Sequence, residues 1–319
     1  MARIDELQLL TKVARLYYEH GIRQADIASQ LKLSQTTVSR LLKRAEEERI
    51  VRISVNVPLG AYPEREEKLQ RAYDLQDVII IDSAKSGPHL NRDIGSAAAY
   101  YIENTIKQNE VIGISAWEST LEHLIEAMHP LPESANIRVV QMLGAIGNNN
   151  KSHILHLTSR MATLLHGSAS FISAPGVAYS VQAAHLYRED PFVHSALDAL
   201  NDITLALVDI SPFPHHEWSN SYQGILNQAD INYLQEHQAV GNLCFRFFDK
   251  DGNAIKSDFD QRVIGIELDQ LRAIPRTIGI SGGLDKVEAI HAALLGGWIK
   301  VLITDQVTAE ALLNKFKQA

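Results

Sequence analysis

From Asp77 onward, short apolar runs alternate with stretches of helical periodicity, and this pattern constrains the fold more than any other feature of the sequence. The runs are rich in β-branched residues, as strands buried on both faces of a sheet are. They are DVIIID (77–82), EVIGIS (110–115), IRVVQML (137–143), SASFIS (168–173), ITLALVDI (203–210), RTIGIS (276–281) and KVLITD (300–305). The alternation predicts an α/β fold, a Rossmann-like, mostly parallel sheet with helices on both faces.

One region of this part departs from the alternation. VGNLCFRFFDKDGNAI and VIGIEL, between residues 240 and 268, contain two alternating runs around Asp251-Gly252-Asn253, which is a strong turn signal. We expect a hairpin there. Cys244 stands beside Phe245 in an apolar run, which indicates a core residue rather than a nucleophile.

The N-terminal residues 24–45, QADIASQLKLSQTTVSRLLKRA, have the pattern of two short helices joined by a tight connection. Ser34 stands where an N-cap would, so the second helix should begin there. Leu7 to His20 forms an amphipathic helix that would complete a three-helix head. Apolar residues that share one face of each short helix can bury a small common core: Ile27, Ala28 and Leu31 in the first, Val38, Leu41 and Leu42 in the second.

Polar and basic side chains remain on the outward face of the second helix. Gln, Thr, Ser and Arg near a helix N-terminus suit base edges in a major groove, and later Arg and Lys residues suit phosphates. Residues 49–57 alternate like a strand that could form a wing beside this helix. A solvated hairpin that touches nothing is the alternative. The candidate DNA-binding residues are Gln24, Ser34, Gln35, Thr36, Thr37, Ser39, Arg40, Lys43, Arg44 and Arg52.

Charge is distributed unevenly along the 319 residues, whose formal net charge is −8. Residues 1–60 hold ten Lys or Arg against seven Asp or Glu, and the remainder holds 20 against 31. This distribution favours a small DNA-binding head on an acidic body with another task. We therefore expect three parts: a helix-turn-helix domain at 1–57, a linker helix within 58–76, and an effector domain at 77–319. The charged linker helix, from Glu64 to Leu75, fits a solvated connector and a self-association element about equally well.

The sequence also indicates a cellular compartment. A single cysteine excludes an internal disulfide, no apolar run is long enough to span a membrane, and the first residues lack a signal-peptide pattern. We expect a cytoplasmic protein that does not bind membranes.

Ligands of open α/β sheets bind at the carboxyl ends of the strands, so the loops that follow the strands are the candidate site. In SAWEST (115–120), hydroxyls and helix N–H groups could hold an anion, although Glu118 would repel a phosphate. GAIGNNNK (144–151) offers glycines for close approach and amides for hydroxyl groups. Ala174-Pro175-Gly176 and SGGLDK (281–286), with the cation Lys286, complete the set. Each loop alone fits an ordinary connection equally well, but together they converge on one edge.

Catalytic and metal sites have little support in the sequence. His215-His216-Glu217 is the densest histidine cluster, but adjacent loop residues seldom bind one metal. The motifs of serine hydrolases, P-loop proteins, dinucleotide-binding proteins and zinc proteases are missing. We therefore expect no catalytic residues, no metal and no cofactor.

With both parts in view, the chain resembles the SorC family of sugar-responsive bacterial transcriptional regulators nearly from end to end. The most specific matches are LYYEHGIRQADIASQLKLSQTTVSRLLKRAEEERIVRI, VGNLCFRFFDKDGNAI and IPRTIGISGGLDKVEAIHAALLGGWIKVLITDQVTAEALL. The resemblance implies a body with the fold of phosphosugar isomerases and coenzyme A transferases, without their catalysis. It also implies a phosphorylated sugar or polyol as effector.

The resemblance further implies positions for the effector contacts. The family's phosphate-binding turn falls on residues 115–120, its second ligand loop on 144–148, and its polar contacts on Asp249 and Lys286. The chain departs from the family at SAWEST, at Ala145, and at Asp209 and Ser211, where the family usually has glycines. The candidate effector-binding residues are Ser115, Trp117, Glu118, Ser119, Thr120, Gly144, Gly147, Asn148, Pro175, Asp249 and Lys286.

These observations predict a DNA-binding transcriptional regulator whose operator affinity changes when a sugar phosphate binds the body, and which controls carbohydrate catabolism genes. One helix-turn-helix reads few base pairs, so we expect a homodimer or, following the resemblance, a homotetramer. A sugar-phosphate isomerase or deaminase with an appended helical head is one alternative. A DNA-binding protein whose body only oligomerises is the other.

Overall fold

The computed structural model describes residues 2–48, 50–51, 61–82, 87–115, 119–131, 136–146, 151–213 and 225–317, without the side chains of 2–6 and 151–154. The chain divides into two compact units, Met1–Pro58 and Leu59–Ala319. The wing expected at residues 49–57, Arg52 included, lies almost entirely outside the described residues. No described helix is long and apolar enough to cross a membrane.

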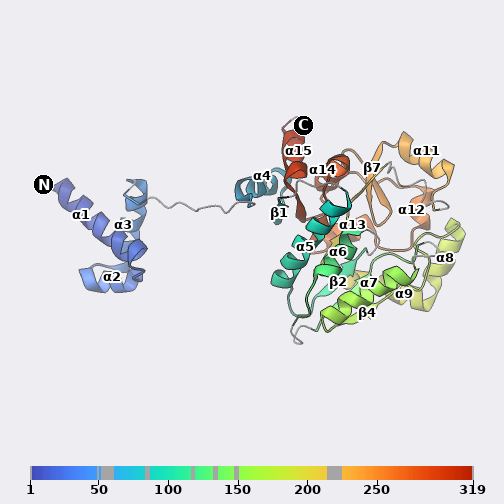
Figure 1. Cartoon of the computed structure of the whole chain (residues 1–319), viewed down its shortest axis with the longest axis horizontal. Coiled ribbons are helices and arrows are strands. Elements are labelled where there is room, and N and C mark those ends of the chain that lie inside the picture. The colour runs from blue at the N-terminus through green and yellow to red at the C-terminus, as the bar shows by residue number, and fades with distance from the viewer. Residues whose placement is uncertain are drawn as a thin grey trace. The chain divides into compact units, whose positions relative to one another are not determined.

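The first unit contains the three expected helices (Figure 1). They are α1 (Ala2–Ala14), which continues as a π-helical turn over Arg15–Glu19, α2 (Gln24–Leu31) and α3 (Gln35–Glu47). Lys32 ends α2 in the left-handed conformation, with φ 56°, and so permits the tight connection to α3. The helices enclose a small core of Val13, Ile27, Ala28, Val38 and Leu42.

A seven-stranded sheet forms the centre of the second unit, and all seven predicted strands belong to it. Every pair is parallel, in the order β1-β10-β9-β5-β2-β3-β4. The α/β fold predicted from the sequence is therefore confirmed. The strands are β1 (Asp77–Ile81), β2 (Val111–Ile114), β3 (Arg138–Gln141), β4 (Ser168–Ser170), β5 (Leu205–Val208), β9 (Arg276–Ile280) and β10 (Val301–Asp305).

Helices cover both faces of this sheet, because side chains of alternate strand residues enter two separate cores. On β3, Val139 packs in one core and Val140 in the other. The first core contains residues of α5 (Pro88–Thr105), α6 (Ser119–Ala127) and α7 (Lys151–Leu164). The second contains residues of α4 (Pro63–Tyr73), α8 (Val181–Glu189), α9 (Pro191–Asp198), α13 (Leu268–Ala273), α14 (Val287–Leu295) and α15 (Gln306–Phe316).

The strand order contains one topological switch point. From β2 the chain proceeds outward to β3 and β4, and then returns to β5 on the other side of β2. The loops that follow β2 and β5 therefore leave the sheet in opposite directions. Open α/β sheets bind ligands in the crevice that such a divergence produces.

The predicted hairpin with its turn at 251–253 is wrong, because this region forms a small antiparallel sheet with a different turn. Its strands are β6 (Ser211–Pro212), β7 (Ala239–Leu243) and β8 (Arg246–Asp249), and the turn between β7 and β8 is Cys244-Phe245. Both turn residues have positive φ, 51° and 61°, so Cys244 lies in a buried turn and not within a strand. The predicted turn at 251–253 exists, but it follows β8 and leads only to a bridge between Phe248 and Ala254. Helices α11 (Gln228–Glu236) and α12 (Asp258–Arg262) lie in the same part of the chain.

The predicted linker helix is part of the second unit. Leu69 and Tyr73 on α4 are buried in its core. The Glu66 carboxylate accepts a hydrogen bond from the backbone N–H of Ile80 on β1, at 2.9 Å, and burial raises the pKa of Glu66. The boundary between the two units therefore precedes this helix, and α4 is not a free connector.

Candidate functional site

Helix α3 presents the predicted DNA-reading face. The Ser34 hydroxyl accepts a hydrogen bond from the backbone N–H of Thr37, at 3.1 Å, which confirms the predicted N-cap. Arg44 forms an ion pair with Glu48, at 2.8 Å. Gln24, on α2, is half-buried, whereas the remaining described candidates are exposed: Ser34, Gln35, Thr36, Thr37, Ser39, Arg40, Lys43 and Arg44. This polar surface, opposite the buried Val38 and Leu42, has the layout of a major-groove reading helix.

In the second unit, a buried carboxylate directly after β5 contacts polar groups from two other segments, which follow β9 and β2. Asp209 is 2% exposed. It contacts Lys286 Nζ through both oxygens, at 2.8 and 3.0 Å. It also accepts hydrogen bonds from the hydroxyls of Ser281, at 2.7 Å, and Thr120, at 3.0 Å, and from the Ile210 backbone N–H, at 2.7 Å. We call Asp209, Lys286, Ser281 and Thr120 the carboxylate cluster.

The carboxylate cluster lies at the switch point, because its members follow β5, β9 and β2 at their carboxyl ends. The Lys286 side chain is 13% exposed and its charge is balanced in place by Asp209. The cation that the sequence offered for an anionic ligand is therefore already paired. Sequence reasoning noted Asp209 only as a departure from the family pattern. A charged residue directly after a buried strand, at an expected ligand edge, was the available signal.

Helix α6 begins beside the carboxylate cluster. Ser119, its first residue, accepts a hydrogen bond from Asn91 Nδ2 on α5, at 2.9 Å. The two helices pack closely, because a Cβ at Gly95 would lie 2.8 Å from the Thr120 carbonyl oxygen. Ser115, which directly follows β2, is buried. Trp117 and Glu118 lie outside the described residues.

The second predicted ligand loop is held by close backbone pairing. Gly144 donates its N–H to the Ile264 carbonyl, at 2.9 Å, and Ala145 bridges to Pro175. A Cβ at Gly144 would lie 2.6 Å from the Ala174 carbonyl oxygen, so a larger residue would force the two loops apart. The structure thus brings Gly144 and Pro175 together at the carboxyl edge. Gly147 and Asn148 lie outside the described residues.

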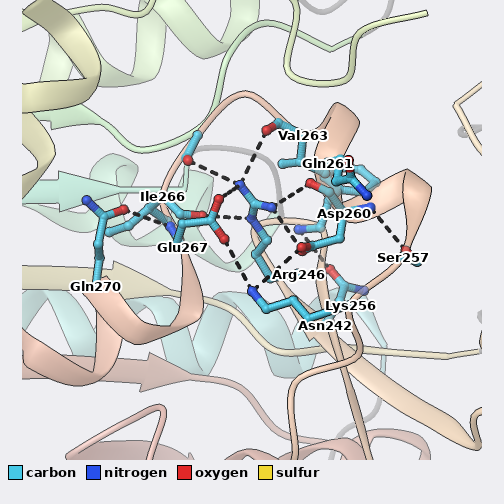
Figure 2. Close-up of polar contacts among 12 residues, drawn as sticks. Asn242, Arg246, Lys256, Ser257, Asp260, Gln261, Val263, Ile266, Glu267 and Gln270 are labelled. Carbon is cyan, nitrogen blue, oxygen red and sulfur yellow. Dashed lines mark hydrogen bonds and ion pairs between the residues drawn. The ribbon is translucent and has the colours of Figure 1, made fainter. Parts of the chain in front are cut away.

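Arg246, a buried residue that sequence reasoning missed, supports the loop at Gly144 through the segment 263–267. Figure 2 shows the Arg246 guanidinium between the carboxylates of Asp260, at 2.9 Å, and Glu267, at 2.7 Å. It also donates to the carbonyls of Ile266 and Val263, at 2.9 and 3.3 Å. Because Ile264 in this segment accepts the Gly144 N–H, Arg246 positions the loop. Burial and, second, the Arg246 charge lower the pKa of neighbouring Arg188, which also donates to the Val263 carbonyl.

Asp249, a predicted effector contact, lies at the end of β8 and stabilises a local turn. Its Oδ1 accepts hydrogen bonds from the backbone N–H groups of Asp251 and Asn253, at 3.0 and 2.8 Å. The turn it stabilises packs against the C-terminal end of α14, where a Cβ at Gly252 would lie 2.3 Å from the Gly296 nitrogen. Lys286 lies at the other end of α14. The Asp249 carboxylate therefore stabilises a local turn. The sequence does not distinguish an aspartate with this role from one that contacts a ligand.

The described residues include no group of three or more His, Cys, Asp or Glu side chains that could hold a metal ion. The cluster at 215–217 lies outside them. Chemically, the edge offers hydroxyls, a paired cation and carboxylate, backbone N–H groups and close glycines. Such groups recognise a polar, hydroxyl-bearing small molecule.

A helix-turn-helix unit followed along the chain by a doubly covered α/β domain with a polar carboxyl edge is typical of a transcriptional regulator with a ligand-binding domain. A family model described as a putative sugar-binding domain matches residues 58–314. The chain is 31% identical to the uncharacterized transcriptional regulator YjhU of Escherichia coli, over 93% of this chain and 92% of that protein. It is 30% identical to the deoxyribonucleoside regulator of Bacillus subtilis, over 97% and 98%.

A solved structure gives the same result over the whole length. The full-length sorbitol operon regulator SorC of Klebsiella pneumoniae aligns with 97% of this chain and 99% of its own, with a TM-score of 0.73 and 26% identity. The chain belongs to the SorC family of transcriptional regulators with a sugar-binding domain. Its relatives are named as regulators and not as enzymes.

Proposed function

We propose that this protein binds operator DNA through α3. Its affinity for the operator would rise or fall when a phosphorylated sugar or polyol binds at the carboxyl edge of the sheet. Its target genes would serve carbohydrate catabolism, as the name of the sorbitol operon regulator suggests for that relative. The protein would act in the cytoplasm. The observation that carries the effector proposal is the convergence of Thr120, Asp209, Ser281 and Lys286 at the switch point.

The site has two kinds of recognition group for such an effector. The first N–H groups of a helix lack intrahelical partners, so the start of α6 suits a phosphate. Lys286 carries three N–H donors and contacts Asp209, which leaves donor capacity for a sugar hydroxyl. A thermal-shift screen with sugar phosphates, polyol phosphates and their uncharged parents tests the proposal. A hit should raise the melting temperature and change operator affinity. If every compound leaves both unchanged, the body only oligomerises.

The reading-helix assignment has a separate test. Arg40→Ala should weaken operator binding by about 1–3 kcal/mol, because an arginine on the reading face contacts bases or phosphates. A gel-shift titration at fixed salt measures this change, and Arg92→Ala on α5 of the body is the matched control. Full operator affinity in Arg40→Ala would remove this residue from the interface.

We also propose that the protein is a homodimer or homotetramer, since paired half-sites require paired reading helices. Three large apolar side chains on and beside α8 and α9 support a subunit contact: Tyr179 is 97% exposed, Leu186 69% and Phe192 81%. Phe192→Asp should lower the mass measured by light scattering. An unchanged mass would place the contact elsewhere.

A further inference from the structure

The second unit has a cavity at the carboxyl edge of the sheet, the same edge that holds the carboxylate cluster. It has a volume of about 450 Å³ and lies where β3 and β4 end. Leu155, Phe171 and Pro175 give it apolar walls, and Gln141, Ser173 and Tyr187 add polar groups. Cavities of this composition bind small molecules that carry both apolar and hydrogen-bonding surface.

Gln141, the last residue of β3, has an unused hydrogen-bond acceptor at this cavity. The side chain is 1% exposed. Its Nε2 donates to the Leu143 carbonyl, which fixes the orientation of the amide, because the reverse orientation would place two oxygens together. Among the described residues, Oε1 has no hydrogen-bond partner. A buried acceptor without a donor is unfavourable, and a ligand that supplies the donor recovers the lost free energy.

The strand register places Gln141 and the carboxylate cluster on the same face of the sheet. Ile114 pairs with Gln141 on one side and with Leu207 on the other. Leu207 and Val139 enter the same core, and side chains alternate along strands, so Asp209 and Gln141 share its face. Gln141 is level with Leu207, and Asp209 lies two residues further along, so the two positions are two strand spacings and two residues apart, about 12 Å in all. This separation matches an extended sugar or polyol chain with a group at each end.

We propose that the cavity is a second subsite, which holds the uncharged end of the effector, and that Gln141 Oε1 accepts a hydrogen bond from its terminal hydroxyl. The proposal rests on the proposed function, because it assigns the far end of the same ligand. It defines the ligand class more narrowly: an open-chain polyol or sugar whose last carbon bears a hydroxyl and lies against apolar side chains. Gln141 is then a specificity-determining residue.

The test combines two ligands with two variants. The ligands are a hexitol phosphate and its deoxy analogue, which lacks the hydroxyl farthest from the phosphate. Gln141→Met keeps the length of the side chain without the acceptor, and Gln235→Met, on the exposed face of α11, is its control. Isothermal titration calorimetry on the full-length protein measures the dissociation constants.

The wild-type protein and Gln235→Met should bind the parent about tenfold more tightly than the deoxy analogue. Gln141→Met should bind both with the weaker affinity. A preference that survives in Gln141→Met overturns the proposal, and so does the same loss of affinity for both ligands, which would indicate a structural role. If the wild-type protein binds neither ligand, the proposed effector class fails as well.

A second variant does not depend on substitution of a buried residue. Leu155→Trp, at a position 44% exposed on the cavity wall, should narrow the cavity and weaken the parent ligand about tenfold. Leu295→Trp, at a position 46% exposed at the C-terminal end of α14, should leave the affinity unchanged. Equal affinities in these two variants would exclude the cavity as a subsite.

Discussion

Two buried ion pairs lie at opposite edges of the parallel sheet. At the amino edge, Arg276 at the start of β9 contacts Glu110 just before β2, at 2.8 Å. At the carboxyl edge, Lys286 contacts Asp209, also at 2.8 Å. The side chains of the two carboxylates, Glu110 and Asp209, are 8% and 1% exposed, and both residues flank strands of one sheet. Both pairs stabilise the fold, but only one of them lies at the edge of the sheet where ligands bind.

Their surroundings differ in kind. Arg276 also donates to the Thr105 carbonyl, and Glu110 accepts from the Lys107 N–H, so backbone groups close the amino-edge pair. Asp209 accepts from the hydroxyls of Ser281 and Thr120, which follow strands at the switch point. The amino-edge pair therefore fastens elements together, whereas the carboxyl-edge pair lies where ligands reach the sheet. Burial and charge alone do not identify a site.

The largest expected effect is at the amino edge. Arg276→Met leaves the Glu110 carboxylate buried without its cation, so the free energy of unfolding should fall by about 3 kcal/mol. Urea denaturation measures this loss, and ligand affinity should not change. Arg71→Met, which removes an exposed pair with Glu67 on α4, should cost no more than about 0.5 kcal/mol. Weaker ligand binding by the Arg276 variant would make both edges functional.

Lys286→Met should lose less stability than Arg276→Met but should lose the binding of the effector. Asp209 keeps its two hydroxyl donors and the Ile210 N–H, so unfolding should become easier by only about 2 kcal/mol. The melting-temperature increase produced by the effector should disappear, because the donor beside the ligand is gone. Lys250→Met, at an exposed position, should retain it. An undiminished increase in Lys286→Met would exclude this lysine from the site.

The same contrast shows how far sequence reasoning extends. All seven parallel strands were predicted, because β-branched apolar runs are local signals, but their order depends on contacts between distant residues. The cation at Lys286 was predicted, whereas its partner Asp209, 77 residues away, was noted only as unusual. The hydrogen bonds by which Asp249 stabilises a local turn were not predicted.

The hairpin of the small sheet shows why turn signals are incomplete. Asp251-Gly252-Asn253 has the preferred composition and does form a turn, but Cys244-Phe245 joins β7 to β8. Packing against the core compensates for positive φ at two residues that rarely adopt it. Tertiary contacts of this kind have no local signature. The structural role of Arg246 was missed for the same reason.

Asp209→Asn isolates the role of charge at the carboxyl edge. The amide keeps an oxygen for a hydroxyl donor, so stability should fall by only about 1–2 kcal/mol. Lys286 then has no balancing carboxylate, and the affinity for a phosphate-bearing ligand should rise about tenfold relative to its uncharged parent. Paired calorimetric titrations measure this ratio. Glu110→Gln should leave the ratio unchanged. The same ratio in wild type and Asp209→Asn would show that the phosphate binds away from the pair.

The smallest expected effect concerns α14, the helix that follows Lys286. His291 on α14 is buried against the Tyr73 hydroxyl, at 2.7 Å, and Lys315 and Glu288 face it. Burial and, second, the Lys315 charge lower the pKa of His291, so the unfolded chain takes up the proton first as the pH falls. Stability from this residue is complete above about pH 6.5 and declines below it, until the folded protein is protonated as well.

Urea denaturation at several values between about pH 8 and pH 5.5 should therefore show a steeper acid loss in the wild-type protein than in His291→Gln. The ion pairs at both sheet edges are present in both proteins, so the difference between the two curves reports on α14 alone. If the free energies of unfolding of the two proteins fall in parallel as the pH is lowered, protonation of His291 does not cause the acid loss of stability. The melting-temperature increase produced by the effector could also become smaller at low pH in the wild-type protein only. That result would connect the packing of His291 to the position of Lys286, and it would be a second difference between the carboxyl edge and the amino edge.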